Sequence, residues 1–94
     1  MNVTVVVPGV LRDDTGGRDE LSVDVPVGSD VRAVLDALGP LAPGLGRRLR
    51  DETGALRRHV NVFVGADDVR GLGGLAALVP DGAVLLVLPS VAGG

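Results

Sequence analysis

The chain has 94 residues but no cysteine, no lysine and a single aromatic residue, Phe63. Without cysteine it has neither a disulfide framework nor a thiol nucleophile. One histidine, His59, does not supply the ligand set of a structural zinc site, so we expect no bound metal. With almost no aromatic rings, the hydrophobic core has to be built from valine, leucine and alanine.

A basic surface and a long apolar run are also missing. All 9 basic residues are arginines, and the formal net charge is −3. Such a chain lacks the basic stripe and stacking rings of nucleic-acid-binding proteins, so we expect no nucleic-acid partner. No apolar run approaches the roughly 20 residues that a membrane span needs, and residues 1–8 lack the basic leader of a signal peptide. The composition predicts one cytoplasmic domain without a membrane segment.

What the sequence does contain is a regular series of strand and helix patterns. Residues 2–7 are rich in valine and residues 21–25 alternate apolar and polar, which predicts a β-hairpin with a long loop. A helix follows, capped by Ser29 or Asp30 and ended by Gly39-Pro40. Its apolar stripe has the i, i+3, i+4, i+7 spacing of one helix face and consists of Val31, Val34, Leu35 and Leu38.

The second half of the chain predicts three more strands. A short helix around residues 45–49 precedes a strand over residues 58–64, and a short edge strand is expected at residues 67–70. A turn at residues 80–82 leads into the final apolar strand, residues 84–88. The first and last strands are the most uniformly apolar, so we expect them at the centre of a sheet that is covered on one face.

This order of elements predicts an α+β fold of the β-grasp, or ubiquitin-like, class: a mixed four- to five-stranded sheet packed on one main helix. Residues 1–88 would form the domain and residues 89–94 a flexible C-terminal tail. The tail ends in Gly93-Gly94. Because glycine has no Cβ, such a stalk can carry a terminal carboxylate into a narrow channel. The working group is therefore expected to be the C-terminus itself.

Phe63 marks a candidate docking face for a partner. The three valines of its predicted strand share one side, which puts Phe63 on the other. If the valines meet the helix, Phe63 lies on the open face of the sheet, where we expect Leu85 and Val87, or their neighbours, beside it. An exposed apolar patch of this kind suits docking. The alternatives are that Phe63 only covers a bare sheet, or that the two faces are reversed.

Several segments match the sequence patterns of a known family. They are Val60–Val64, Asp67–Arg70, Gly73–Leu75, Asp81-Gly82 and Leu88–Gly94. Through them, and over nearly its full length, the chain resembles the ThiS/MoaD family of ubiquitin-like sulfur carriers. Within that family it is most similar to the CysO-type branch, the carriers of cysteine biosynthesis. Gly65-Ala66 and Ala83 depart from the family pattern, but both lie in turns.

The resemblance implies a chemistry that takes place at Gly94. A separate E1-like enzyme would adenylate the terminal carboxylate with ATP and magnesium, and a sulfide equivalent would displace AMP to leave a thiocarboxylate. Val91, Ala92 and Gly93 would be the part of the tail that enters partner active sites. The chain would then be a protein co-substrate and not an enzyme, with no catalytic residue or cofactor of its own. Its lack of cysteine agrees with this, because the sulfur then has to be held elsewhere than on a thiol.

The destination of the sulfur stays open. The favoured destination is cysteine, formed on a PLP-dependent cysteine synthase and released from the tail by a zinc-dependent peptidase. The first alternative is the small subunit of molybdopterin synthase, which would give the sulfur to a pterin precursor on the large subunit. The others are a ubiquitin-like protein modifier and a β-grasp interaction module with an inert tail.

A cluster of arginines in this acidic chain is the remaining feature. We interpret it as a solvated loop that is partly balanced by Asp51 and Glu52, with partner steering as the alternative. His59 lies beside it, has no identifiable nucleophile or carboxylate partner, and is interpreted as an edge-strand residue. The cluster consists of Arg47, Arg48, Arg50, Arg57 and Arg58.

Overall fold

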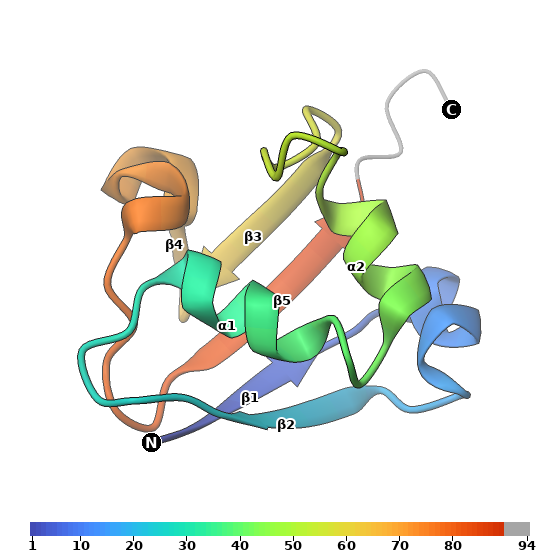
Figure 1. Ribbon diagram of the computed structural model, residues 1–94, viewed down its shortest axis with the longest axis horizontal. Coiled ribbons are helices and arrows are strands. Elements are labelled where there is room, and N and C mark those ends of the chain that lie inside the picture. The colour runs from blue at the N-terminus through green and yellow to red at the C-terminus, as the bar shows by residue number, and fades with distance from the viewer. Residues whose placement is uncertain (90–94) are drawn as a thin grey trace.

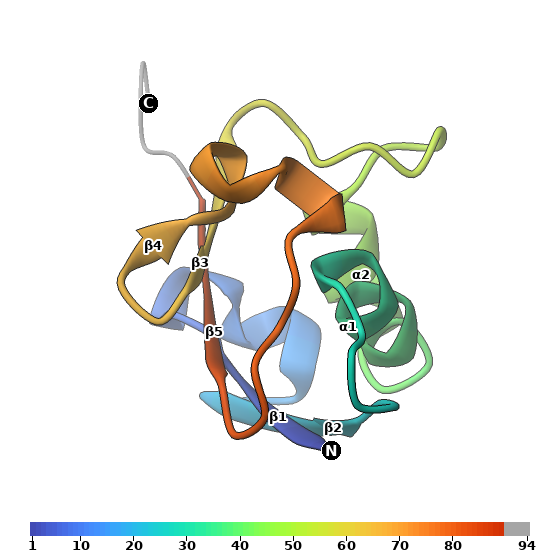
Figure 2. The ribbon, with the colours of Figure 1, turned by 90° about the vertical axis from the view of Figure 1, so that its left-hand side faces the viewer.

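The computed structural model describes residues 1–89, which form a five-stranded mixed sheet with two α-helices on one of its faces (Figures 1 and 2). The elements are β1 (Asn2–Val6), η1 (Gly9–Thr15), β2 (Glu20–Asp24), α1 (Val31–Leu38), α2 (Pro43–Leu49), β3 (Val60–Val64), β4 (Asp67–Asp68), η2 (Val69–Leu72), η3 (Gly74–Ala76) and β5 (Val84–Pro89), where η denotes a 3₁₀-helix. The arrangement is the predicted α+β β-grasp fold.

The strands lie in the order β2-β1-β5-β3-β4. β1 and β2 form the predicted antiparallel hairpin, β1 runs parallel to β5, and β5 is antiparallel to β3. The first and last strands are therefore neighbours inside the sheet, as their apolar character predicts. Because β1 and β5 are parallel, β5 ends at the same end of the sheet as β1.

The core lies between the helices and one face of the sheet. Along β1 and β5 every second residue is buried, which is the period of a strand with one covered face. On the helix side, the four residues of the predicted α1 stripe are all buried. The buried hydrophobic residues are valines, leucines and alanines without exception among residues 1–89. The core is thus built from the small set of side chains that the composition predicts.

The start of α1 is set by Asp30 and not by Ser29. The Oδ1 atom of Asp30 accepts a hydrogen bond from the backbone N–H of Ala33 at 2.9 Å, which satisfies one of the donors that every helix leaves unpaired at its N-terminus. The Ser29 hydroxyl instead donates to the carbonyl of Pro26 at 2.6 Å. α1 ends at Leu38, immediately before Gly39-Pro40 as predicted.

Two segments differ from the sequence prediction. The long loop of the hairpin contains η1, whose end is fixed by the buried Thr15: its hydroxyl lies 2.9 Å from the carbonyl oxygen of Arg12 and 2.6 Å from that of Arg18. The edge strand is only two residues long. The Asp68 carboxylate accepts from the backbone N–H of Arg70 at 2.9 Å, which turns the chain out of the sheet and into η2.

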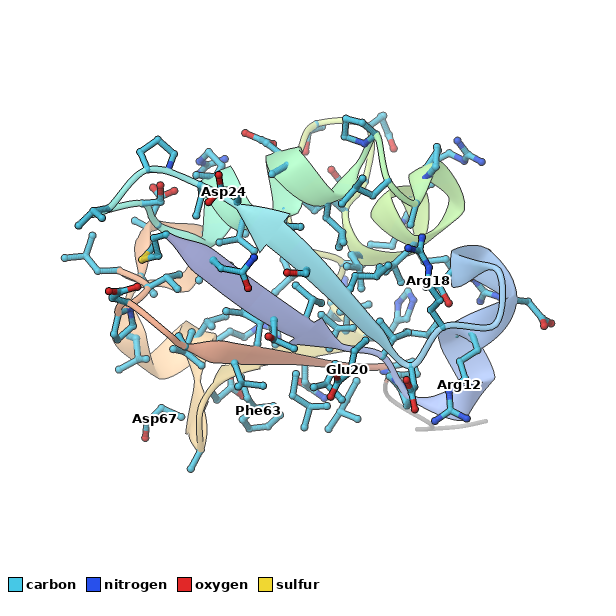
Figure 3. All side chains as sticks on the ribbon, turned by 90° about the horizontal axis from the view of Figure 1, so that it is seen from below. Arg12, Arg18, Glu20, Asp24, Phe63 and Asp67 are labelled. Carbon is cyan, nitrogen blue, oxygen red and sulfur yellow. The ribbon has the colours of Figure 1, made fainter. Side chains whose placement is uncertain are left out.

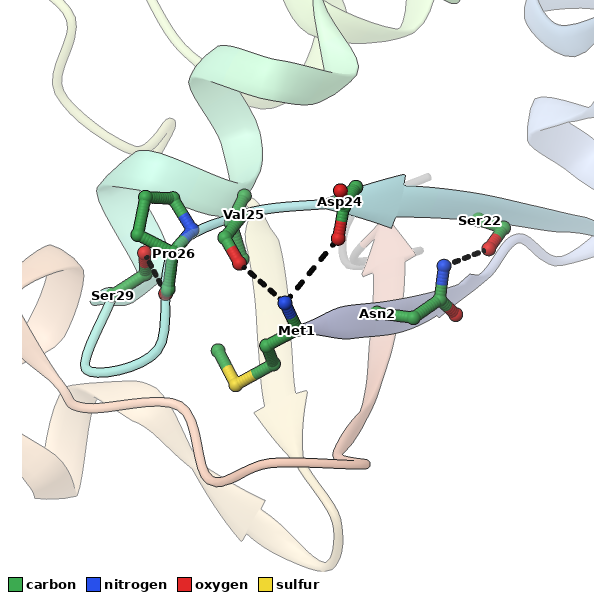
Figure 4. A network of polar contacts seen from close by, with 7 residues as sticks. All are labelled: Met1, Asn2, Ser22, Asp24, Val25, Pro26 and Ser29. Atoms are coloured by element: carbon green, nitrogen blue, oxygen red, sulfur yellow. Dashed lines mark hydrogen bonds and ion pairs between the residues drawn. The ribbon is translucent and has the colours of Figure 1, made fainter.

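Polar contacts join the start of β1 to the end of β2, at the open end of the hairpin (Figure 4). The amino group of Met1 donates to the carbonyl of Val25 at 2.9 Å and forms an ion pair of 3.3 Å with Asp24. One residue on, the Asn2 amide donates to the Ser22 hydroxyl at 2.6 Å. These contacts fasten the edge strand β2 to β1. Within residues 1–89, no helix has the length and apolar character required to cross a membrane.

Candidate functional site

The point where the chain leaves the sheet lies beside the start of β3. Pro89, which the sequence assigned to the tail, is the last residue of β5 and pairs with Val60, the first residue of β3. Gly94, the predicted reacting residue, and the stalk formed by Val91, Ala92 and Gly93 lie outside the described residues. The geometry available for the site is therefore that of the exit and of the surfaces around it.

A hollow of about 230 Å³ lies at this exit, between η1, α2 and the start of β3. Its floor is apolar and its rim carries an imidazole and a guanidinium. The lining residues are Val10, Leu11, Arg48, Leu49, His59, Val60 and Pro89. No sequence pattern predicts this hollow, because its walls come from four segments that are distant along the chain.

A second hollow of about 430 Å³ adjoins the first and shares Arg48 and His59 with it. Its other lining residues are Asp14, Gly44, Arg47 and Arg57. Arg48 donates from Nε to the Asp14 carboxylate at 3.0 Å. A Cβ atom at Gly44 would come within 2.9 Å of Asp14 Oδ1. The absence of a side chain at Gly44 therefore leaves space for the Asp14 carboxylate in this ion pair.

The structure separates the five clustered arginines. Arg47, Arg48 and Arg57 surround the second hollow, whereas Arg50 turns to α1 and forms an ion pair of 2.8 Å with Asp36. Their ion-pair partners within residues 1–89 are Asp14 and Asp36. Of the two carboxylates predicted to balance the cluster, Asp51 forms no ion pair with it but does interact with the charge of Arg57. The Arg48–Asp14 and Arg50–Asp36 pairs each join two different elements, so the order of residues along the chain does not reveal them.

The Asp51 carboxylate forms its hydrogen bonds within its own turn. Its Oδ1 atom accepts hydrogen bonds from the hydroxyl and the backbone N–H of Thr53 and from the backbone N–H of Ala55. These bonds, first among them that from the Thr53 hydroxyl, hold the pKa of Asp51 below its ordinary value, and the charge of Arg57 adds a smaller effect in the same direction. Asp51 is therefore a turn-stabilising residue.

Phe63 lies on the sheet face that the helices leave open, as predicted (Figure 3). Directly opposite it on β5 is Leu86, and opposite Leu86 on β1 is Val6, so three half-buried apolar side chains cross the sheet in one row. We call Val6, Leu86 and Phe63 the apolar row. Glu20 on β2 and Asp68 on β4 stand at its two ends.

Leu85 and Val87, predicted to lie beside Phe63, are on the other face of the sheet. Both are fully buried at 0% exposure, where they pair with Val64 and Val62 in the core. Their neighbours Leu86 and Leu88 lie on the Phe63 face, as the alternation of a strand requires. A run of five apolar residues carries no polar position to reveal which face is which, so the error follows from the sequence pattern.

Comparison with known proteins places the chain in a family. The family model described as "ThiS family" matches residues 5–94. The chain belongs to the ThiS family. It is 43% identical over 96 aligned positions to the sulfur carrier protein CysO of Mycobacterium tuberculosis, with all of both chains covered.

Solved structures of ThiS-family-like folds agree with this. CysO in the BexX/CysO complex of Amycolatopsis orientalis is 41% identical and superimposes with a TM-score of 0.86, covering 98% of this chain and 99% of that one. SAMP1 of Haloferax volcanii, a small archaeal modifier protein, has a TM-score of 0.86 at 26% identity and full coverage of both chains. Both likenesses confirm the β-grasp fold.

In residues 1–89 of this ThiS-family chain, the structure shows two hollows around the exit at Pro89 and an apolar row on the open face. His59 makes no side-chain hydrogen bond to another residue within 1–89, although it lines both hollows. In the same range, no three acidic or histidine side chains are close enough together to hold a metal ion. The candidate functional features of residues 1–89 are the exit at Pro89, the hollows beside it and the apolar row on the open face.

Proposed function

We propose that this chain is a sulfur carrier, whose terminal Gly94 carboxylate is adenylated by an E1-like enzyme and converted to a thiocarboxylate that donates its sulfur for cysteine biosynthesis. The observation that carries the proposal is the 43% identity over the full length of proteins named sulfur carrier protein CysO. The chain itself is a co-substrate, and the enzymes that act on it supply the catalysis and the ATP, magnesium and PLP.

The proposed reaction solves a chemical problem of the carboxylate. A free carboxylate resists nucleophilic attack, because its charge is delocalised and oxide is a very poor leaving group. If a carboxylate oxygen of Gly94 attacks the α-phosphorus of ATP, pyrophosphate leaves and an acyl-adenylate forms. A sulfur nucleophile then attacks the acyl carbon and expels AMP, which leaves sulfur on the terminus. The chain has no cysteine, so the terminus is the position it offers for this sulfur.

The position of the exit supports delivery into a partner. Five residues follow Pro89, and a fully extended chain of five residues spans at most roughly 17 Å. This length is sufficient to bring Gly94 into a buried active site while the folded domain stays outside. The tail ends in residues with small side chains, which suits passage through a narrow channel.

The apolar row supplies a docking face for such partners. Val6, Leu86 and Phe63 form a continuous apolar strip on an uncovered sheet, and the exposed Val84 lies on the same face. Apolar side chains gathered on a rigid sheet are a suitable centre for a protein interface. CysO of A. orientalis has been solved in a complex with BexX, which shows that a similar carrier associates with a second protein.

The proposed partners act in sequence in the cytoplasm. The E1-like enzyme would form the adenylate and mediate transfer of sulfur to the tail. On a PLP-dependent cysteine synthase, the thiocarboxylate would then be the nucleophile that adds to an aminoacrylate. The product is cysteine attached to the tail, and a zinc-dependent peptidase releases it. A pterin precursor on the large subunit of molybdopterin synthase is the competing acceptor of the same sulfur.

Intact-mass spectrometry tests the proposal directly. After incubation with the activating enzyme, ATP, magnesium and a sulfur source, we expect the chain to gain the mass difference of one oxygen replaced by one sulfur. Deletion of Gly94 is expected to abolish the gain, and the absence of any gain in the intact chain contradicts the proposal. Adding the PLP-dependent synthase and an activated serine should give a cysteinyl adduct; a thiocarboxylate that forms no adduct favours the pterin acceptor.

The likeness to SAMP1, 26% identical with full coverage, favours protein modification as a second candidate function. In that case Gly94 would be joined to lysine side chains of other proteins. The chain has no lysine, so it would not form lysine-linked chains with itself. Affinity purification of the tagged chain from cells under denaturing conditions distinguishes the two, because only a modifier leaves conjugates with isopeptide-linked Gly94.

A further inference from the structure

The two hollows at the exit form one groove. They share Arg48 and His59, and Pro89 lines the smaller of them. We call the joined hollows the tail-base groove. It lies at the end of the molecule formed by η1, α2 and the start of β3, and it is distinct from the apolar row, which lies on the open face of the sheet.

One half of the groove carries an excess of positive charge. Three guanidinium groups line it, and among residues 1–89 only that of Arg48 has a carboxylate within ion-pair distance, Asp14 at 3.0 Å. Arg57 donates from Nε to the carbonyl of Arg47, which is a neutral acceptor. Arg47 and Arg57 thus form no ion pair within residues 1–89, and although the charge of Arg57 also acts on Asp51, both guanidinium groups can interact with an outside anion. The formal net charge of the chain is −3.

The other half of the groove is apolar. Leu11, Leu49 and Val60 form its buried floor, whereas Val10 stands on its rim with 66% of its surface exposed. An exposed valine above an apolar floor loses unfavourable contact with water when another apolar side chain enters. The groove thus combines a place for a small apolar group with a place for negative charge.

The short distance to Gly94 limits what can cover the groove. Five residues link Pro89 to the terminal carboxylate, so the reacting centre of any enzyme that engages Gly94 lies within roughly 17 Å of the groove. An enzyme whose active site lies that close to Pro89 and that docks on the apolar row is large enough to extend over η1 and α2 as well. The part of it that would face the groove is then close to the entrance of the channel that receives the tail.

We propose that the tail-base groove binds an acidic segment of the activating enzyme, beside the entrance of the channel that receives the tail. Carboxylates of this segment face Arg47 and Arg57, and an apolar side chain packs against Val10. The proposal rests on the proposed function, since it concerns the enzyme that adenylates Gly94. Charge pairs at the rim of an interface mainly raise the association rate and make it dependent on salt.

The first test reverses one charge in the groove and one elsewhere. Arg47→Glu changes an exposed side chain for which residues 1–89 provide no hydrogen bond, and Arg32→Glu makes the same charge change at an exposed position of α1 that lines neither hollow. ATP–pyrophosphate exchange by the activating enzyme is measured with the carrier as the varied substrate. We expect Arg47→Glu to raise KM about tenfold with little change in kcat, and Arg32→Glu to change KM less than about twofold. The difference should shrink at high salt.

The second test addresses the apolar half with a matched pair of exposed valines. Val10→Asp places a carboxylate at the rim of the groove, and Val27→Asp places one in the loop before α1, where Val27 is 80% exposed. We expect Val10→Asp to raise KM several-fold and Val27→Asp to leave it unchanged. Thermal unfolding of all four variants shows whether each remains folded at the assay temperature.

One result would count against the proposed function, and two others would count against the groove proposal. If the unmodified chain supports no pyrophosphate exchange, the proposed function itself fails. If it does, and Arg47→Glu behaves like Arg32→Glu at low salt, the groove proposal is wrong and the carrier function stands. If inorganic pyrophosphate shifts the His59 NMR signals of the isolated chain, while the Arg47→Glu exchange kinetics are unchanged, the groove is a free-anion site and the proposal is overturned.

Discussion

Phe63 and Leu86 stand directly opposite each other on β3 and β5, on the face of the sheet that no α-helix covers. Phe63, the one Phe, Tyr or Trp residue of the chain, thus lies beside Leu86. The residue that precedes Leu86 on β5, Leu85, is fully buried on the other face. One strand, β5, therefore supplies the core on one side and the candidate docking face on the other. This division allows stability and recognition to be perturbed separately.

Phe63→Ala tests the docking role of the apolar row. We expect it to weaken binding of the activating enzyme by about 1–2 kcal/mol, because truncated aromatic residues at the centre of an interface have costs of this size. Isothermal titration calorimetry measures the affinity. Leu78→Ala is the control, since Leu78 is 71% exposed but lies outside the sheet strands. Equal affinities of the two variants would contradict docking on this face.

Leu85→Ala and Leu86→Ala test the assignment of the two faces of β5. Leu85 is fully buried, so its truncation is expected to lower the free energy of unfolding by about 2–5 kcal/mol. Leu86 is half-buried on the open face, and its truncation should cost about 1 kcal/mol. Urea denaturation followed by circular dichroism measures both. A reversed order of the two costs would mean that the sheet faces are the other way round.

Arg70 ties the loop before β3 to the edge of the sheet. Its guanidinium donates to Asn61 Oδ1 and to the carbonyl of Arg57, both at 3.0 Å. We expect Arg70→Ala to lower the free energy of unfolding by about 1 kcal/mol, the usual net contribution of such bonds. Hydrogen exchange should accelerate in residues 55–60. Arg32→Ala serves as the matched control, and equal exchange in both variants would show that the ties contribute nothing.

The Asp51 turn predicts a pH-dependent contribution to stability. Hydrogen bonds from Thr53 lower the pKa of Asp51 in the folded chain relative to the unfolded chain. The contribution is therefore fully present above the unfolded pKa of about 3.9 and is lost as the pH falls through the lower folded value. Thr53→Ala removes the main cause, so NMR titration should give a higher pKa for Asp51 in this variant. An unchanged Asp51 pKa would contradict the turn geometry.

Local sequence patterns were sufficient to predict most of the fold. The α1 stripe, the breaker at Gly39-Pro40 and the alternation around Phe63 each depend on neighbouring residues, and each was confirmed. The order of apolar segments then favoured the β-grasp arrangement. Features that depend on a few adjacent residues were predictable because their physical cause lies within the same segment.

The features that were missed depend on contacts between distant segments. The face of Leu85 is set by its register against Val64, and the ion pair of Arg48 is set by the approach of η1 to α2. The groove at Pro89 has walls from four elements, η1, α2, β3 and β5. The η1 helix within the predicted loop depends on the burial of Thr15, a polar residue whose partners are backbone carbonyls. None of these leaves a periodic signal.

The parallel pairing of β1 with β5 also determines at which end the protein can be attached to a support. Met1 lies at one end of the sheet and Pro89 at the other (Figure 1), so the amino-terminal pole faces away from the point where the chain leaves the sheet. Val27 is an exposed residue at that pole, and because the chain has no cysteine, Val27→Cys would give a chain with one thiol, remote from Pro89. Immobilised through that thiol, the protein would present its exit outward to every enzyme in solution.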